Sequence, residues 1–277
     1  EKFASEQYSG ILASITGDQE PETVNIGGPG IVPLIHTSQL LTDQSFKVRF
    51  YGGTGSDKTS MVIYDLLKQT PLDTRNFKII SSKPTPFTVV FSDPSFNESQ
   101  GEHSIINNIG AAWDYRPEHL GDSFFDSDIV CFGGTALVPA IHDNLTSLLE
   151  KAKRNNCITV VNTVFDFRNE KENPGRPWPL GKTQESLQLI DLLIMGREEA
   201  LKISGRYNPE DAAKYFIDNK ASAFIITNGA EDFYAYSMGG IFEDTKLLKL
   251  PVSARVKEDI ISRPWLKGDT TGCGDNF

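Results

Sequence analysis

The hydrophobic positions of the chain alternate between short apolar runs and helical spacings. Runs rich in β-branched and aliphatic residues predict strands at residues 47–51, 128–132, 158–162, 191–195 and 223–227. Between them, apolar residues recur at helical spacing from Ile141 to Ala152, and Asn208-Pro209-Glu210-Asp211 has the order of a helix start: a cap, a proline and an acidic return partner. Several strands are apolar throughout, which is typical of a buried sheet. The pattern predicts an α/β fold with a mostly parallel sheet.

Two segments break this rhythm. Residues 8–26 and 87–112 have short alternating apolar and polar positions, and we expect both to contribute strands to one small antiparallel sheet that stands off the main sheet. Residues 169–182 contain three prolines and predict a surface loop. No internal repeat is evident, so we expect a single domain over residues 1–277.

Composition narrows the class of protein. The chain has 277 residues, 39 % of them hydrophobic, which is enough for one sizeable core. With 27 basic and 37 acidic residues its formal charge is -10, and no Lys/Arg cluster forms a track for nucleic acid. No apolar run approaches the roughly 18 residues that span a bilayer, and no charged-then-apolar leader opens the chain. We therefore expect a protein with neither a nucleic-acid nor a membrane partner.

The cysteines and histidines exclude two further classes. Three cysteines are too few and too scattered for a disulfide framework, so we expect the reducing cytoplasm. Neither residue type has metal-ligand spacing, which argues against a zinc enzyme, and we expect structural or surface roles for the histidines. These residues are Cys131, Cys157, Cys273, His36, His103, His119 and His142.

The final nine residues, Asp269-Thr-Thr-Gly-Cys-Gly-Asp-Asn-Phe277, carry the most specific chemistry. Glycines at 272 and 274 let successive backbone N–H groups converge into an anion-binding turn, and the residues after Asp275 favour a helix start. A carboxylate beside a phosphate site is unfavourable unless it takes a proton from an attacking hydroxyl, so the pattern indicates phosphoryl transfer. The alternative interpretation is a tight turn with an Asx cap.

This run resembles the C-terminal signature Asp-Thr-x-Gly-Ala-Gly-Asp of the ribokinase family, also called the PfkB carbohydrate kinases, with Cys273 in place of Ala. The resemblance extends over about residues 26–277. It implies a ribokinase-like three-layer α/β sandwich with a small β lid over the sugar site, and a homodimer through the lid as a candidate assembly. It also implies ATP-dependent phosphorylation of a hydroxyl on a sugar or sugar-like substrate. Asp275 would be the general base, and the anion hole would be framed by Thr270, Gly272, Cys273 and Gly274.

Near the start of the chain, Gly27-Gly28 matches the family's Gly-Gly pair, which implies a hinge and a close approach to the sugar. Val32 stands where the family has Asn, so the identity of the substrate stays open. Further on, Gly52, Gly55 and Asp57 resemble the family's Gly-x-x-Gly-x-Asp segment, and Lys58 in place of a third glycine excludes a dinucleotide fingerprint. The alternative for Gly27-Gly28 is an ordinary loop.

The remaining assignments also follow from the resemblance. Residues 164–168 stand where the family has Asp-x-Asn-x-Arg, and Arg168 matches the final Arg of that pattern. Arg168 is therefore a candidate substrate contact, and the alternative is an ordinary surface ion pair. Residues 196–199 stand where the family has Asn-x-x-Glu, a motif that organises Mg²⁺ through water. Glu199 matches the Glu of this motif, and Gly196 replaces its Asn. Thr227 and Gly229 match the first two fixed positions of the family's nucleotide loop Thr-x-Gly-x-x-Gly, and Asp232 replaces its last glycine. The alternative interpretation of this segment is a strand-to-hairpin turn. Asp269 and Thr271 are candidates for holding K⁺, which only some members use.

Two other functions stay open. A nucleoside kinase of the same family fits the motifs nearly as well, because Val32 departs from the sugar pattern. A non-catalytic binding or regulatory protein of this fold is suggested by Val32, Gly196 and Asp232, although the presence of Asp275 weighs against it. The family pattern begins with a strand before the position of Glu1 and continues beyond Phe277, so we expect both flanks to be missing from this sequence.

Overall fold

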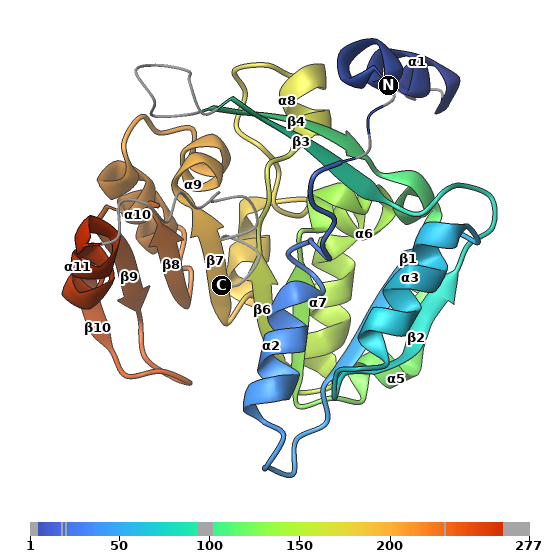
Figure 1. Ribbon diagram of the computed structural model, residues 1–277. Coiled ribbons are helices and arrows are strands. Elements are labelled where there is room, and N and C mark those ends of the chain that lie inside the picture. The colour runs from blue at the N-terminus through green and yellow to red at the C-terminus, as the bar shows by residue number, and fades with distance from the viewer. Residues whose placement is uncertain (1–4, 18, 20, 94–101, 230, 263–277) are drawn as a thin grey trace.

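The structure, a computed structural model, describes residues 5–17, 19, 21–93, 102–229 and 231–262 (Figure 1). Its largest sheet has six strands in the order β10-β9-β8-β7-β6-β5. Strands β5 to β8 run parallel, and β9 pairs antiparallel with both β8 and β10. The bounds are β5 Ile129–Gly133, β6 Ile158–Asn162, β7 Leu192–Gly196, β8 Ala223–Thr227, β9 Phe233–Ser237 and β10 Thr245–Leu250. The expected α/β fold with a mostly parallel sheet is confirmed.

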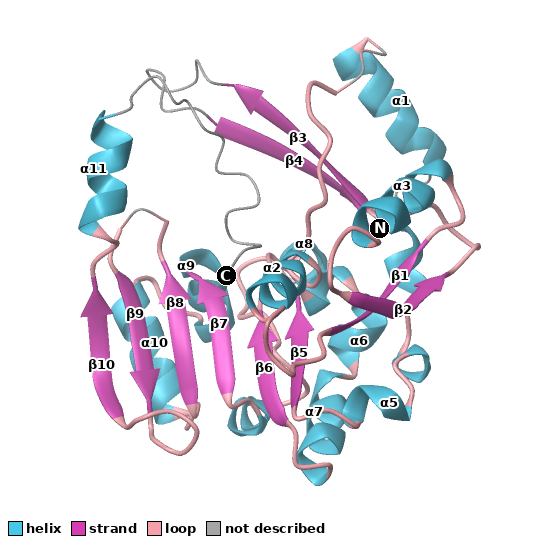
Figure 2. Cartoon of the chain, turned by 60° about the horizontal axis from the view of Figure 1, so that its bottom comes forward, coloured by secondary structure: helices cyan, strands magenta, loops and turns pink. Residues whose placement is uncertain are grey.

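Helices lie on both faces of this sheet. In Figure 2, α9 (Arg197–Ser204) and α10 (Pro209–Asp218) lie behind the strands and α2 (Val32–Leu40) lies in front. The predicted helix start is confirmed, because the Asn208 side chain accepts a hydrogen bond from the Asp211 N–H at 2.9 Å and caps α10. The predicted helical stretch 141–152 is divided between α6 (Pro139–Asp143) and α7 (Leu145–Arg154).

The main core lies between the sheet and these helices. Its fully buried members include Leu149 of α7, Phe216 of α10, and Leu193, Phe224 and Ile226 of the strands. Shorter elements close the remaining connections: α5 (Asp122–Phe125), α8 (Phe167–Glu172), α11 (Ala254–Ser262) and the 3₁₀ helices η1 (Gly110–Asp114), η2 (Pro117–His119), η3 (Thr135–Leu137) and η4 (Gln184–Leu189). No helix within the described ranges is long and apolar enough to cross a membrane.

A second, smaller core forms around a two-stranded parallel sheet. Strands β1 (Arg49–Thr54) and β2 (Asp73–Ile79) are joined by α3 (Lys58–Leu67). Ile31, Leu67, Leu72 and Phe77 form the centre of this core. The strand predicted at residues 47–51 therefore exists, but within the described residues it pairs with β2 and not with the main sheet.

Strands β3 (Phe87–Asp93) and β4 (Glu102–Asn108) form an antiparallel pair that stands off the main sheet. Their register runs from Phe87↔Asn108 to Asp93↔Glu102. In both Figure 1 and Figure 2 the pair lies beyond the carboxyl ends of β5 to β8. Strands were expected within residues 87–112, and this part of the lid prediction is confirmed.

The other half of the lid prediction is wrong. Residues 8–26 supply no strand to this sheet in the described part of the chain, and Ser5–Thr16 forms helix α1. Ile11 and Ile15 are four residues apart and so share one helix face. Gly17 follows in the left-handed region at φ 60°, and its N–H bonds the Ala13 carbonyl at 2.9 Å. A glycine C-cap of this kind ends a helix and not a strand.

Candidate active site

Four connections meet at the carboxyl edge of the main sheet. They follow β5 at Gly133, β6 at Asn162, β7 at Gly196 and β8 at Thr227, and ligands of open α/β sheets bind outside this edge. Residues 263–277 lie outside the described residues. The assignments of Asp269, Thr270, Thr271, Gly272, Cys273, Gly274 and Asp275 therefore stay predictions from the sequence.

The segment that follows Gly27-Gly28 packs directly on the end of β5. A Cβ on Gly133 would overlap the Pro29 carbonyl oxygen and lie 2.8 Å from the Gly30 Cα, and one on Gly134, at φ 58°, would overlap the Pro29 ring. Only glycine permits this backbone approach. The sequence reasoning singled out the Gly27-Gly28 pair but missed the packing of Pro29 and Gly30 on Gly133 and Gly134, although two glycines at the end of an apolar strand were the available signal.

Asp57 of the Gly-x-x-Gly-x-Asp segment fastens the start of the β3–β4 pair. Its carboxylate caps α3 by accepting the Ser60 N–H at 3.0 Å, and it accepts the Thr85 N–H at 2.7 Å. Burial opposes ionisation, but the hydrogen bonds from Thr85 and Ser60 outweigh it and hold the pKa of Asp57 below its usual value. A Cβ on Gly55 would lie 2.5 Å from the Thr85 nitrogen. This segment therefore acts as a clamp on the strand pair.

Arg168 lies in α8, the helix that follows β6 after a short loop. One terminal guanidinium nitrogen donates to Asp143 Oδ2 at 2.9 Å, and the other pairs with Asp143 Oδ1. The hydrogen bonds from Arg168 lower the pKa of Asp143. Because a guanidinium has five N–H donors, this pair leaves donors for a ligand. The predicted surface loop over residues 169–182 is wrong in part, since α8 extends to Glu172 and Trp178 and Leu180 are buried.

A buried polar cluster beside Arg168 was missed by the sequence reasoning. The His142 ring lies between Thr135 Oγ1, 3.0 Å from Nδ1, and Asp166 Oδ2, 3.4 Å from Nε2. All three residues are buried. Burial lowers the pKa of His142 in spite of the nearby Asp166 carboxylate, so the ring is neutral at neutral pH. The structural role expected for His142 agrees with this burial, but no sequence signal joined it to Asp166.

Glu199 lies at the first turn of α9, after β7. Its carboxylate folds back and accepts the backbone N–H groups of Gly196 and of Glu199 itself. A Cβ on Gly196 would overlap Glu199 Oε2, so glycine at this position leaves room for the carboxylate. Burial raises the pKa of Glu199, and the neighbouring charge of Glu198 adds to the effect. Among the described residues no lysine or arginine neutralises this carboxylate, which suits it to a site that receives a cation.

Thr227 and Gly229 stand at the end of β8. The Thr227 hydroxyl donates to the Met195 carbonyl at 3.4 Å and so joins the ends of β8 and β7. Gly229 adopts φ 58°, and a Cβ there would meet no atom of the described residues within 4 Å. Asp232, where the family has a glycine, lies 3.6 Å from the Lys249 ammonium. The turn therefore presents open backbone at the edge where a nucleotide is expected.

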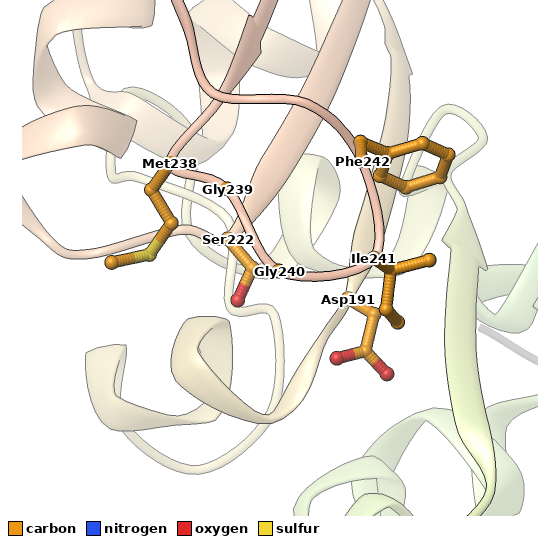
Figure 3. Close-up of a pocket in the computed structure, with 7 residues that line it drawn as sticks. All are labelled: Asp191, Ser222, Met238, Gly239, Gly240, Ile241 and Phe242. Carbon is orange, nitrogen blue, oxygen red and sulfur yellow. The ribbon is translucent and has the colours of Figure 1, made fainter.

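A pocket of about 380 Å³ lies at the opposite edge of the sheet (Figure 3). Asp191 directly precedes β7 and Ser222 directly precedes β8, and residues 238–242 between β9 and β10 complete its wall. The Asp191 carboxylate accepts the Thr159 N–H at 2.8 Å and pairs with Lys153. This carboxylate thus holds β6 and β7 together, and the pocket is separate from the candidate active site.

Comparison with known proteins identifies the same family. The model of the pfkB family of carbohydrate kinases matches residues 23–277. A search of curated proteins finds no match. Among solved structures, adenosine kinase from Schistosoma mansoni in complex with 2-fluoroadenosine superposes with a TM-score of 0.73 at 16% identity, covering 98% of this chain and 76% of that one.

Two ribokinases superpose as well. The enzyme from Thermotoga maritima gives a TM-score of 0.62 at 19% identity, covering 93% of this chain and 73% of its own. The ribokinase of Arabidopsis thaliana complexed with ribose and ATP gives 0.62 at 18% identity, covering 93% and 76%. At these identities the structures establish a common fold, and the family match extends over nearly the whole sequence. The chain belongs to the PfkB family of carbohydrate kinases.

Proposed function

We propose that this protein is an ATP-dependent kinase that transfers the γ-phosphoryl group to a hydroxyl of a sugar or sugar-like substrate. The observation that carries the proposal is the run Asp269-Thr-Thr-Gly-Cys-Gly-Asp275 in a chain that belongs to this family. The carboxyl edge of the sheet supports it, because open backbone at Gly229 and a carboxylate at Glu199 lie at the ends of adjacent strands.

In this proposal Asp275 accepts the proton of the attacking hydroxyl. The N–H groups of residues 272–274 face the transferred phosphoryl group and stabilise its developing charge, a contribution of several kcal/mol, about 3–4 for a single well-placed donor. Arg168 and the Gly27-Gly28 segment bind the acceptor. Strands β3 and β4 cover the site and exclude water, since hydrolysis of ATP is the competing reaction.

The nucleotide side of the site consists of Thr227, Gly229 and Glu199. The exposed backbone of the Gly229 turn supports this assignment, and Glu199 would hold Mg²⁺ through water. Bound ATP with Mg²⁺ supplies the phosphoryl group and offsets its charge. K⁺ held by Asp269 and Thr271 remains a further proposal that rests on the sequence alone.

The substitution Asp275→Asn tests the assignment of the base. Turnover should fall by roughly a hundredfold or more, while ATP affinity and melting temperature stay close to those of the unaltered protein. The measurement is a coupled assay of ADP release on the purified full chain, with ATP binding by calorimetry as the control. Near-normal turnover in the substituted protein would remove Asp275 from the mechanism.

A nucleoside acceptor is the second candidate, because Val32 stands at the position of the family's substrate-binding Asn. An apolar side chain there cannot hydrogen-bond a sugar hydroxyl, so the pocket would contribute packing instead. A protein that binds such ligands without turnover is the third candidate. Phosphorylation of any acceptor in the Asp275-dependent assay excludes this last possibility.

A further inference from the structure

Two consecutive residues of α6 fasten two positions of the segment that follows β6. His142 faces Asp166, with 3.4 Å between Nε2 and Oδ2, and Asp143 pairs with Arg168 through both guanidinium nitrogens. We call residues 166–168, held in this way, the α8 anchor. It places Arg168 at the carboxyl edge of the sheet from two fixed points on one neighbouring helix.

The His142 ring also ties the α8 anchor to the end of β5. Its Nδ1 lies 3.0 Å from the hydroxyl of Thr135, which follows Gly134 in the turn that packs on Pro29. Asp166 in turn caps α8 by accepting the Asn169 N–H at 2.9 Å and its side-chain N–H at 2.6 Å. The ring therefore connects the loop after β5 with the loop after β6, and both loops belong to the acceptor side of the site.

A purely structural role would be met better by an apolar side chain. His142 is 6% exposed, and its Nε2 has no well-formed hydrogen bond with the described residues, although Asp166 and the backbone of Pro179 lie near the ring. A cavity of about 20 Å³ beside the ring is lined by His142, Thr163, Asp166 and Trp178, among others. Burying an incompletely paired polar ring costs stability, so its presence indicates a contribution other than stability.

We infer that His142 is a positioning residue that, through Asp166, holds the α8 anchor in place and thereby sets the affinity for the acceptor substrate. The inference rests on the proposed function in one respect, which is the assignment of Arg168 to the acceptor. In the neutral ring, Nδ1 contacts the Thr135 hydroxyl in the loop after β5, and Nε2 faces the Asp166 carboxylate in the loop after β6. The charged groups that face the ring are Asp166 from the loop after β6, Arg168 from α8 and Asp143 from α6.

The test compares three substitutions in the full chain. His142→Leu removes both polar contacts, His142→Gln keeps an acceptor for Thr135 and a donor for Asp166, and Lys153→Met serves as the control. Lys153 pairs with Asp191 at the opposite edge of the sheet, so its loss affects stability away from the acceptor side. We expect His142→Leu to raise the acceptor KM by about tenfold or more, with kcat and the KM for ATP changed by less than about threefold.

The expected pattern includes rescue. His142→Gln should restore the acceptor KM to within about threefold of the unaltered protein, and Lys153→Met should leave the acceptor KM unchanged even where it lowers the melting temperature. An equal rise of acceptor KM in the Leu and Gln variants, or in the control, would overturn the inference. A fall in kcat alone, with an unchanged acceptor KM, would overturn it as well.

A second measurement does not depend on activity. Hydrogen exchange of the peptide over residues 163–172 should be faster in His142→Leu than in the unaltered protein and unchanged in Lys153→Met. If no acceptor is phosphorylated by the unaltered protein, the proposed function fails while this exchange result still decides whether His142 holds the α8 anchor. Unchanged exchange in His142→Leu would overturn the inference whatever the activity.

Discussion

Glu199 shows how a single glycine alters the electrostatics of a helix start. Because Gly196 has no Cβ, the Glu199 carboxylate can fold back over the first turn of α9 and accept backbone N–H groups. The carboxylate is then partly withdrawn from water without a cationic partner among the described residues, and burial raises its pKa. Glycine at position 196, where the family has Asn, thus leaves room for the Glu199 carboxylate, and the role of Glu199 in organising Mg²⁺ stays a proposal.

The replacement Glu199→Gln should stabilise the ligand-free protein at neutral pH. A carboxyl whose folded pKa is raised contributes stability below its unfolded pKa of 4.5, and this contribution is lost as pH rises through the folded pKa. Gln removes the buried charge and keeps a carbonyl oxygen for the Gly196 N–H. Melting temperature at pH 7 should rise, and the Mg²⁺ concentration for half-maximal activity should rise with it. A lower melting temperature would contradict the assignment.

Cys273 should be replaceable by Ala with most activity retained. In the proposed anion hole this position contributes its backbone N–H, and its side chain needs only to be small. A bulky thiol adduct should abolish activity by blocking the phosphate position, and ATP should protect against it. Alkylation is measured in a Cys131→Ala background, since Cys131 is exposed and Cys157 is buried. The proposed turn would be refuted by a Cys273→Ala variant as inactive as Asp275→Asn.

At the scale of elements, the β3–β4 pair depends on a clamp at its first residues. Gly55 and Gly110 both leave space for the backbone of residues 83–86, and the Asp57 carboxylate holds Thr85 from the start of α3. This arrangement fixes where β3 begins relative to β1. The orientation of the strand pair beyond the sheet edge is therefore set by backbone contacts that a Cβ would disrupt.

The substitution Gly55→Ala should destabilise the protein by about 1–3 kcal/mol, because a Cβ would press on the backbone of Lys83 and Thr85, which cannot yield as a side chain can. Asp57→Ala should lower stability by about 1 kcal/mol through loss of the α3 cap. The effect of Asp57 should be full above its unfolded pKa of 3.8 and should be lost progressively as pH falls through its lower folded pKa, because protonation removes the hydrogen-bonded charge. Urea unfolding at pH 7 and pH 3 measures both effects. A pH-independent loss in Asp57→Ala would contradict the electrostatic part.

The strands of the main sheet were predictable where they are buried. The runs predicted at 158–162 and 223–227 match β6 and β8 fully, and those for β5 and β7 differ by one residue at each end. These strands were predictable because each is a largely apolar run bounded by polar residues, as is typical of a strand buried on both faces. Strands β2 and β10 were not predicted, because most of their exposed positions carry polar residues, and β9 was not predicted although none of its residues is exposed. Helix α1 was predicted as a strand because the prediction relied on the alternation of apolar and polar residues and did not consider Gly17, which ends the helix.

The candidate site was predictable only where a motif marks it. Gly28, Glu199, Thr227 and Gly229 were assigned through the family resemblance. The structure places Glu199 and Thr227 at the ends of β7 and β8, Gly229 just after β8, and the residues that follow Gly28 against the end of β5, while their roles stay predictions. His142 and Asp166 were not found, since they are distant in sequence and belong to no motif. Their proximity arises from the packing of α6 against the loop after β6, which no local pattern reports.

At the scale of the whole molecule, ligand binding should report on the substrate. The sugar and nucleoside alternatives differ in which ligand stabilises the native state. A ligand at a hundred times its Kd adds about 2.7 kcal/mol, which for a domain of this size corresponds to a rise in melting temperature of roughly 5–10 °C. A thermal-shift panel of sugars and nucleosides, with and without ATP and Mg²⁺, measures this. Shifts from nucleosides alone would replace the sugar proposal, and shifts from neither would argue against both.

The contact between Pro29 and the glycines after β5 has a consequence for synthesis of the chain. Pro29 and Gly30 leave the ribosome long before Gly133 and Gly134, the residues on which they pack. At about 5–20 residues per second, the roughly one hundred intervening residues take some 5–20 s to translate. Throughout that interval Pro29 and Gly30 lack the residues that they contact in the folded protein. The packing of Pro29 and Gly30 on the end of β5 can therefore form only after Gly133 and Gly134 have been synthesised.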